Sequence, residues 1–114
     1  MPPKSDAIRI RHMLDAARDA AAFCQGRQPE DLEVDRMLSW AVVKALEVIG
    51  ETASQVTDET RQQLVSVPWR EVVTMRHRLV HAYFNIRFDI VRNTVQDDLP
   101  PLVAALEAWL AEPA

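Results

Sequence analysis

The segment from Met75 to Phe84, MRHRLVHAYF, places two arginines, two histidines and a tyrosine close together. A histidine titrates near neutral pH and can accept or donate a proton, whereas an arginine keeps its positive charge and can stabilise an anion. A helix that only stabilises a fold would carry its charges on the outer face and aliphatic residues on the inner one. This segment does not follow that pattern, so it is the first candidate for a functional site.

The expected position of Arg76 in a continuous helix conflicts with its charge. With Val72 at zero and 100° per residue, Met75 and Leu79 fall on the core-facing arc, Arg76 lies at about 40° and Tyr83 at about 20°. Burying a guanidinium without a partner costs several kcal/mol, because it cannot lose its proton. We therefore expect its head to reach out of the core or to point into a polar cleft.

Each of these side chains also has a purely structural interpretation. Arg76 could pair with a core carboxylate, His77 and His81 could form an exposed pair one turn apart on the opposite side, and Tyr83 could fill the core. Two histidines at this spacing can bind a metal, but no third cysteine, histidine or acid is marked nearby as a ligand. We therefore expect no metal site and no cofactor.

Composition predicts a single all-α domain over residues 1–114. The chain has only two glycines and many alanines, leucines and arginines, which suit helices better than a sheet with tight turns. The net charge of −4 excludes bulk electrostatic coating of nucleic acid, so any such contact must be local. The single Cys24 excludes an internal disulfide, and without a secretory signal or a membrane-spanning run we expect a cytoplasmic protein.

Periodicity and capping residues predict five or six helices. The first is expected to begin with Ser5 as its cap and to end at Gly26. After a loop, the second is expected from about Asp35 to Gln55, and a short third helix covers residues 58–67.

The second half of the chain is expected to hold the candidate segment within a fourth helix that begins at Pro68. Asp89 is expected to cap the helix that follows. Asp97 or Asp98, together with the prolines at 100 and 101, is expected to start the last helix. These helices complete a bundle.

The predicted second helix has apolar residues over well over half of its circumference, which is wide for a helix that faces only its own domain. They are Leu38, Ala41, Val42, Ala45, Leu46, Val48, Ile49 and Ala53. We therefore expect a second subunit to cover part of it, as a two-fold homodimer. Gly50 indicates a close helix crossing, because glycine otherwise costs about 1 kcal/mol in a helix. Glu47 and Glu51 are expected in solvent, with the alternative that they face a partner or a site arginine.

The stretch from Arg70 to Arg92 is the one basic region of this acidic chain, with five arginines against Glu71 and Asp89. Arg78, Arg87 and Arg92 are the candidate contacts to a nucleic-acid backbone, and His77 adds to them. The alternative is that any of these side chains is merely solvated.

The candidate segment resembles the R-x4-H-x-Y motif of HepT-type toxins in the HEPN superfamily, read as Arg76, His81 and Tyr83. The resemblance continues in AVVKALEVIGETASQV, in VPWREVVTMRHRLVHAYF and in FDIVRNTVQDDLPPL, in the order and at the spacing of that family. It covers most of the chain from Asp6 to Leu110. The chain is therefore expected to fold as a HEPN-like helical bundle.

The resemblance implies a metal-independent endoribonuclease whose active cleft forms between two subunits. By this analogy His81 is the general base or acid and Arg76 stabilises the phosphorane, while the 2′-OH of RNA is the nucleophile. It also implies that a minimal nucleotidyltransferase antitoxin of the MntA type transfers AMP to Tyr83. The negative charge of the added AMP would repel phosphate, and the AMP group would cover the cleft. Two departures from the family are His77, where asparagine or aspartate is frequent, and Ala82, where glycine is frequent.

A second interpretation belongs to another functional class. The chain could be a catalytically silent nucleotide-binding or scaffold partner that helps a nucleotidyltransferase modify something else. The presence of Arg76, His81 and Tyr83 together favours the enzyme, because a scaffold does not need all three.

Overall fold

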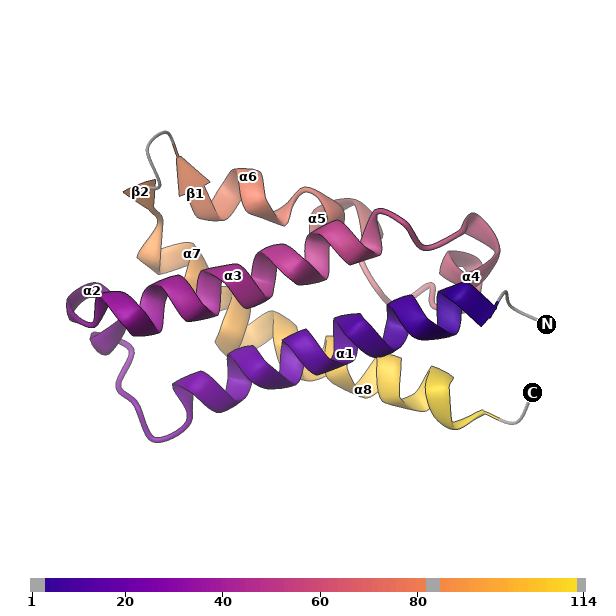
Figure 1. The fold of residues 1–114 in the computed structure, drawn as a ribbon, viewed down its shortest axis with the longest axis horizontal. Helices are drawn as coiled ribbons and strands as arrows, with labels where there is room; N and C mark the ends of the chain where they lie inside the picture. Colours follow the sequence, from indigo (N-terminus) through magenta and orange to yellow (C-terminus); the bar gives the residue numbers. More distant parts are fainter. Residues whose placement is uncertain (1–3, 82–84, 113–114) are drawn as a thin grey trace.

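The computed structural model describes residues 4–81 and 85–112 and is mostly helical (Figure 1). Its elements are α1 (Lys4–Cys24), α2 (Asp31–Val34), α3 (Arg36–Ala53), α4 (Asp58–Gln63), α5 (Trp69–Val73), α6 (Met75–Leu79), β1 (Val80–His81), β2 (Asn85–Ile86), α7 (Phe88–Asn93), the π-helical turn η2 (Thr94–Asp98) and α8 (Leu99–Ala111). The predicted all-α fold class is confirmed. Within the described residues there are more helical segments than five or six, because one predicted helix is broken and one predicted loop contains α2.

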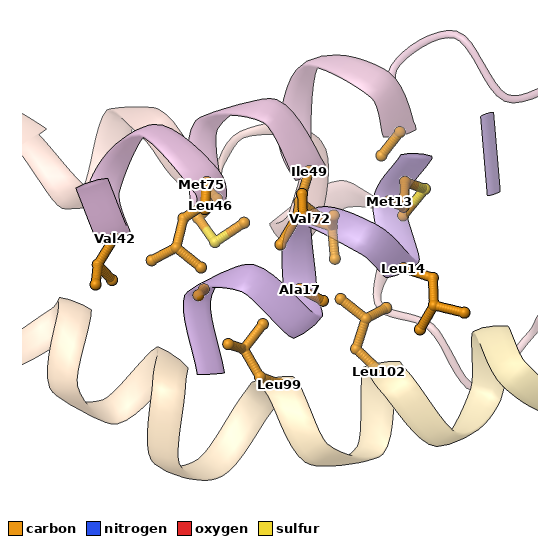
Figure 2. Close-up of a cluster of buried hydrophobic side chains, with 14 of the residues drawn as sticks. Met13, Leu14, Ala17, Val42, Leu46, Ile49, Val72, Met75, Leu99 and Leu102 are labelled. Carbon is orange, nitrogen blue, oxygen red and sulfur yellow. The ribbon is translucent and has the colours of Figure 1, made fainter. Parts of the chain in front are cut away.

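The core lies between α1, α3 and α8, with α5 and α6 on the other side of α3 (Figures 1 and 2). Leu46 and Ile49 of α3 are fully buried, as are Met13 and Ala17 of α1. Complete burial of a side chain of the size of leucine contributes about 1.5–3 kcal/mol. Burial of the apolar residues of the long helices therefore stabilises their packing, and the shorter elements pack against these helices.

The predicted ends of the two long helices agree with the structure except at Ser5. The Asp35 carboxylate accepts a hydrogen bond from the Leu38 N–H at 3.1 Å and caps α3, as the sequence indicates. Gly26 has a φ of +74° just beyond α1, which a residue with a side chain rarely adopts. The prediction that Ser5 caps the first helix is wrong, because α1 already includes it.

Most of the wide apolar arc of α3 is covered within the chain itself. α1 packs on one side of α3, and α5 and α6 pack on the other. A Cβ added at Gly50 would lie 2.8 Å from the backbone oxygen of Val72, which confirms the close helix crossing. Ala41 and Val48 remain half-buried, and the predicted homodimer stays a prediction.

The prediction that one helix beginning at Pro68 contains the candidate segment is wrong, because α5, α6 and β1 follow one another there. The helix breaks at Thr74, whose side-chain hydroxyl donates to the Arg70 carbonyl at 2.7 Å, a back-bond that bends helices. α6 ends at Leu79, and the chain continues as β1, which pairs antiparallel with β2. The Arg87 N–H donates to the Leu79 carbonyl at 2.8 Å and closes this hairpin.

Two other predicted boundaries are wrong. α4 ends at Gln63 and not at residue 67, and Asp89 does not cap α7. Asp89 instead lies in the first turn of α7, where it pairs with Arg87. The predicted start of the last helix agrees with the structure, because α8 begins at Leu99, directly after Asp98, with proline in its first turn. Asp98 makes no side-chain capping hydrogen bond, and the π-helical turn η2 precedes α8.

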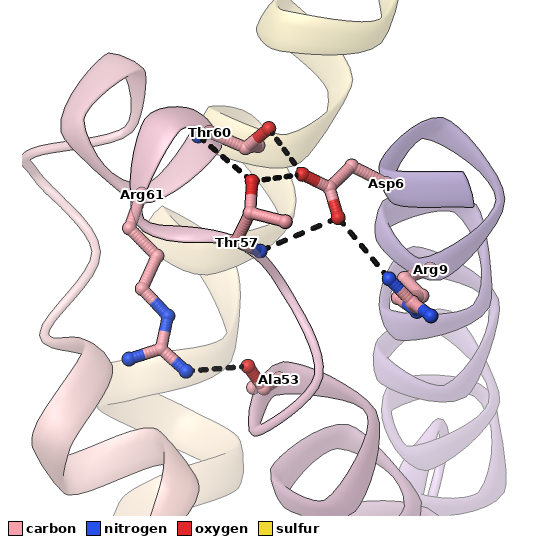
Figure 3. Close-up of polar contacts among 6 residues, drawn as sticks. All are labelled: Asp6, Arg9, Ala53, Thr57, Thr60 and Arg61. Carbon is pink, nitrogen blue, oxygen red and sulfur yellow. Dashed lines mark hydrogen bonds and ion pairs between the residues drawn. The ribbon is translucent and has the colours of Figure 1, made fainter. Parts of the chain in front are cut away.

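A buried carboxylate joins the N-terminal end of α1 to α4 (Figure 3). Asp6 is fully buried, and it accepts hydrogen bonds from the Thr57 N–H at 3.3 Å, from the Thr57 hydroxyl and from the Thr60 hydroxyl at 2.6 Å. Arg9 donates to the same carboxylate at 3.4 Å. Arg61 completes this end of the molecule by donating to the Ala53 carbonyl at 2.9 Å. The network therefore ties α1, α3 and α4 together.

We expect an Asp6→Ala variant to lose at least about 2 kcal/mol of its free energy of unfolding, because buried hydroxyl donors lose a charged acceptor. Burial alone would raise the pKa of Asp6, but the hydrogen bonds from Thr57 and Thr60 outweigh it and hold the pKa below its ordinary value of 3.8. The unfolded chain then takes up the proton first as pH falls, so the stabilisation is complete above pH 3.8 and is lost progressively below it.

Urea unfolding at a series of pH values measures this effect, with Asp6→Asn as the control that removes the titrating group. The wild type should lose more stability than Asp6→Asn as the pH falls from about 4 to about 2. Parallel curves for the two proteins would contradict the role of the Asp6 charge.

Candidate functional site

Arg76 is held at the surface by a carboxylate from another helix. Its Nε donates to Oε2 of Glu47 on α3 at 3.0 Å, and the two side chains are 57% and 18% exposed. Met75 and Leu79 are buried, as the helical projection predicts, and the Arg76 guanidinium reaches out of the core, as its charge led us to expect. The alternative that Arg76 pairs with a carboxylate is confirmed. Glu47 is half-buried and faces Arg76, which agrees with the alternative that this glutamate contacts a site arginine and not with its expected position in solvent.

This ion pair leaves most of the Arg76 guanidinium available. A guanidinium carries five N–H donors, and within the described ranges only the Nε donor has a hydrogen-bond partner. Both Nη groups can therefore donate to an approaching anion, and a phosphate accepts such a pair of parallel hydrogen bonds.

β1 follows directly after α6 (Figure 1). His81 lies on β1, and its side chain is exposed. His77 lies on α6 next to Arg76 and is also exposed. Neither imidazole has a hydrogen-bond partner in residues 4–81 and 85–112. The predicted pair one helical turn apart is wrong, because α6 ends at Leu79 before His81. Within the same residues no hydrogen bond or ion pair joins Arg76 to His81, which share one short segment beside α3.

Tyr83, the predicted acceptor of AMP, lies between β1 and β2 and falls outside the described residues, as does Ala82. Its predicted role as the acceptor of AMP therefore stays a prediction. His81 and Asn85, which flank this gap, face each other across the two strands.

Each of the three arginines predicted to contact RNA makes a hydrogen bond or an ion pair within the protein, and the structure does not bring the three together. Arg78 donates to the Glu71 carbonyl at 2.8 Å and lines a cavity of about 390 Å³ between α5, α6, η2 and α8. Arg87 pairs with Asp89 at 3.1 Å. Arg92 pairs with Glu33 of α2 at 3.5 Å. Binding RNA through Arg87 or Arg92 would require replacing these carboxylates.

The sequence analysis did not select two side chains of α3, Glu47 and Arg36, as site residues. Glu47 was expected in solvent, and the spacing of residues 47 and 76 gives no signal for a contact across 29 positions. Arg36 lies over the ring of Trp40, with its guanidinium carbon 5.1 Å from the ring centroid. The i, i+4 spacing of Arg36 and Trp40 on a helix is the signal that could have found this second pair.

Among the described residues, no cluster of three or more histidine, cysteine or acidic side chains could hold a metal ion. In the same part of the chain, no helix has the length and apolar character needed to cross a membrane. Cys24 is half-buried, and burial raises the pKa of its thiol although Arg27 acts in the opposite direction. This thiol therefore lacks the lowered pKa of a reactive cysteine.

Residues 13–109 match the family described as ribonuclease HepT-like. The chain is 36% identical over 78 residues to the "Probable ribonuclease HepT" of Thermococcus cleftensis, covering 68% of this chain and 71% of that protein. It is 30% identical over 95 residues to a protein of Methanocaldococcus jannaschii named as a candidate RNase, covering 83% and 87%. A candidate RNase of Caldanaerobacter subterraneus is 32% identical over 93 residues, covering 82% and 83%. No solved structure matches the chain.

The match to the family spans most of the chain and includes the whole segment from Met75 to Phe84. The relatives carry names that give a single activity, cleavage of RNA. An RNase function is thus supported for a mostly helical protein that exposes a fixed arginine and a histidine in one segment. The chain belongs to the HepT-like ribonuclease family.

Proposed function

We propose that the chain is a metal-independent endoribonuclease in which Arg76 and His81 carry the reaction. The observation that supports this proposal best is the hydrogen bond from Arg76 Nε to Glu47, because it fixes a permanent charge while leaving both Nη groups to a phosphate. His81 is exposed in the same segment, and an imidazole can act as a general base or a general acid.

The chemistry requires two proton transfers and one charge stabilisation. The 2′-oxygen of a ribose attacks the adjacent phosphorus as its proton passes to an imidazole, and the phosphorane charge is held by the guanidinium. The bond from phosphorus to the 5′-oxygen then breaks, and this oxygen takes a proton. The products are a 2′,3′-cyclic phosphate and a free 5′-hydroxyl. RNA supplies its own nucleophile, so this sequence of steps needs no metal-bound water.

A homodimer with the cleft between two subunits would supply a second imidazole. One copy of His81 could then accept the proton of the 2′-OH while the other gives a proton to the leaving oxygen. Such an isologous dimer is the commonest symmetric assembly, and it places two copies of Arg76 around one substrate.

In the cell we propose that this RNase acts in the cytosol as a toxin, and that a minimal nucleotidyltransferase is its antitoxin. Transfer of AMP from ATP to the Tyr83 hydroxyl forms a tyrosyl phosphodiester and releases pyrophosphate. The added negative charge next to His81 would repel the RNA backbone, and the adenosine would occupy the space of the substrate. Inhibition would therefore be both electrostatic and steric.

Purified wild type and His81→Ala, incubated with single-stranded RNA in EDTA, test the proposal. Cleavage by the wild type that survives chelation and is absent from His81→Ala is the expected result, because only the proton acceptor has been removed. A parallel arm adds the nucleotidyltransferase and ATP and measures by mass spectrometry whether Tyr83 gains AMP as cleavage stops. Induction of each protein alone reports on growth and on the integrity of cellular RNA.

Intact RNA and normal growth, from folded wild type without a modification on Tyr83, would reject the RNase toxin. The scaffold partner of a nucleotidyltransferase would then be the better account. Cleavage that stops in EDTA would instead reject the metal-independent mechanism while leaving the RNase function in place.

A further inference from the structure

One edge of α3 carries Arg36, Trp40 and Glu47. At 100° per residue these three positions fall within about 40° of one another around the helix axis. Glu47 marks the place of Arg76, because the two side chains are hydrogen-bonded. Arg36 lies on the same edge, about 16 Å closer to the N-terminal end of α3 at 1.5 Å per residue. A short single-stranded segment bound at Arg76 can therefore follow this edge to Arg36.

The charge of Arg36 is not neutralised by its surroundings. Arg87 and Arg92 each pair with a carboxylate, whereas Arg36 has no ion pair in residues 4–81 and 85–112. The neighbouring Asp35 is already engaged, since it accepts from Arg27 at 2.7 Å and from the Leu38 N–H. Arg36 is therefore better suited to bind a phosphate than the arginines that the sequence first suggests.

Trp40 restricts where the Arg36 guanidinium can lie. The guanidinium carbon is 5.1 Å from the centroid of the indole ring, within the range of a cation–π contact, and Trp40 is 45% exposed. Such a contact at the surface holds the long arginine side chain close to one arrangement. Less conformational entropy is then lost when the N–H donors bind an anion, which is the usual advantage of a pre-organised group.

We propose that Arg36, held by Trp40, forms a second phosphate subsite that binds single-stranded RNA beside the phosphate at Arg76. This inference rests on the proposed RNase function and names a part of its substrate site. Arg36 contacts the RNA backbone and carries no sequence information of its own. Trp40 acts through Arg36 as a positioning residue.

The experiment measures the binding of a fluorescent single-stranded oligoribonucleotide by Arg36→Gln at several salt concentrations. We expect the dissociation constant to rise roughly tenfold, because one charge-assisted hydrogen bond to phosphate is lost. The slope of log affinity against log salt should fall by about 0.7, the share of one phosphate contact on a single strand. Arg11→Gln is the matched control, since Arg11 is an exposed arginine on α1 and makes no ion pair among the described residues.

Two further variants test the part played by Trp40. Trp40→Ala should weaken binding by several-fold and Trp40→Phe should recover most of it, because a phenyl ring also attracts the guanidinium. In the Arg36→Gln background, Trp40→Ala should add little. A full additional loss there would overturn the positioning role of Trp40.

An unchanged affinity and salt slope in Arg36→Gln, or an equal loss in Arg11→Gln, would overturn the subsite. A change in oligomeric state of Arg36→Gln, seen by sedimentation without a change in salt slope, would assign this edge to contacts between copies instead. Because binding is measured directly, these outcomes are separate from the proposed function, which fails if the wild type does not cleave RNA.

Discussion

An Arg76→Ala variant is expected to cleave RNA roughly 10²–10³ times more slowly than the wild type, because one fixed donor to the developing phosphorane charge is lost. Single-turnover kinetics at saturating enzyme measure this effect on the chemical step alone. Arg76→Lys should recover little, since an ammonium cannot reproduce two parallel N–H donors or the hydrogen bond from Nε to Glu47. Equal rates for Arg76→Ala and wild type would contradict the role of Arg76 in the reaction.

A Glu47→Ala variant is expected to cleave RNA about 10- to 100-fold more slowly, because Arg76 loses the side chain that positions it. A displacement of a catalytic group by about 1 Å can cost this much. Glu47→Gln keeps an oxygen acceptor for Nε and should retain most of the rate. Glu51→Ala is the matched control, since Glu51 is an exposed glutamate one turn further along α3.

Double variants separate this positioning role from a direct one. In the Arg76→Ala background, Glu47→Ala should cause little additional loss, because its target is already missing. If Glu47→Gln were as slow as Glu47→Ala, Glu47 would act through its charge or by moving a proton, and the positioning interpretation would be wrong.

A Gly50→Val variant is expected to lose about 1–3 kcal/mol of its free energy of unfolding, because the crossing of α3 and α5 has no room for a side chain. Even the Cβ would lie 2.8 Å from the Val72 carbonyl oxygen, which is backbone and cannot turn away. The gain of about 1 kcal/mol that alanine brings to a helix should not offset this clash in Gly50→Ala. Thermal unfolding should show a fall of roughly 4–8 °C for each kcal/mol lost.

The Gly50→Val substitution should also disturb the candidate site around Arg76. Val72 belongs to α5, which leads through Thr74 into α6, so separating α5 from α3 weakens the hydrogen bond between Arg76 and Glu47. Lys44→Ala, on the exposed face of α3, should leave the unfolding temperature nearly unchanged. A Gly50→Ala variant that unfolds at a higher temperature than the wild type would show that the crossing can relax.

The sequence by itself determined the long helices and the chemistry of the segment. Asp35 marks the start of α3, and Gly26 marks the end of α1. Both ends can be read from the sequence, because a capping side chain and a glycine with positive φ act on residues close to them in the chain. Gly50 marked a close crossing, although not the partner that makes it. The residue types of Arg76 and His81 were sufficient to indicate proton transfer and anion binding, since these properties belong to the side chains themselves.

The tertiary structure decided where these side chains lie. The helical projection left open whether the Arg76 head reaches into solvent or into a polar cleft, and the packed structure places it at the surface against Glu47. Glu47 reaches Arg76 across 29 positions, and Glu33 reaches Arg92 between α2 and α7. Periodicity describes neighbours along one helix, whereas these pairs depend on how separate helices pack. The sequence offered Glu47 only as an alternative contact of a site arginine, and the packing of α3 against α6 decided it.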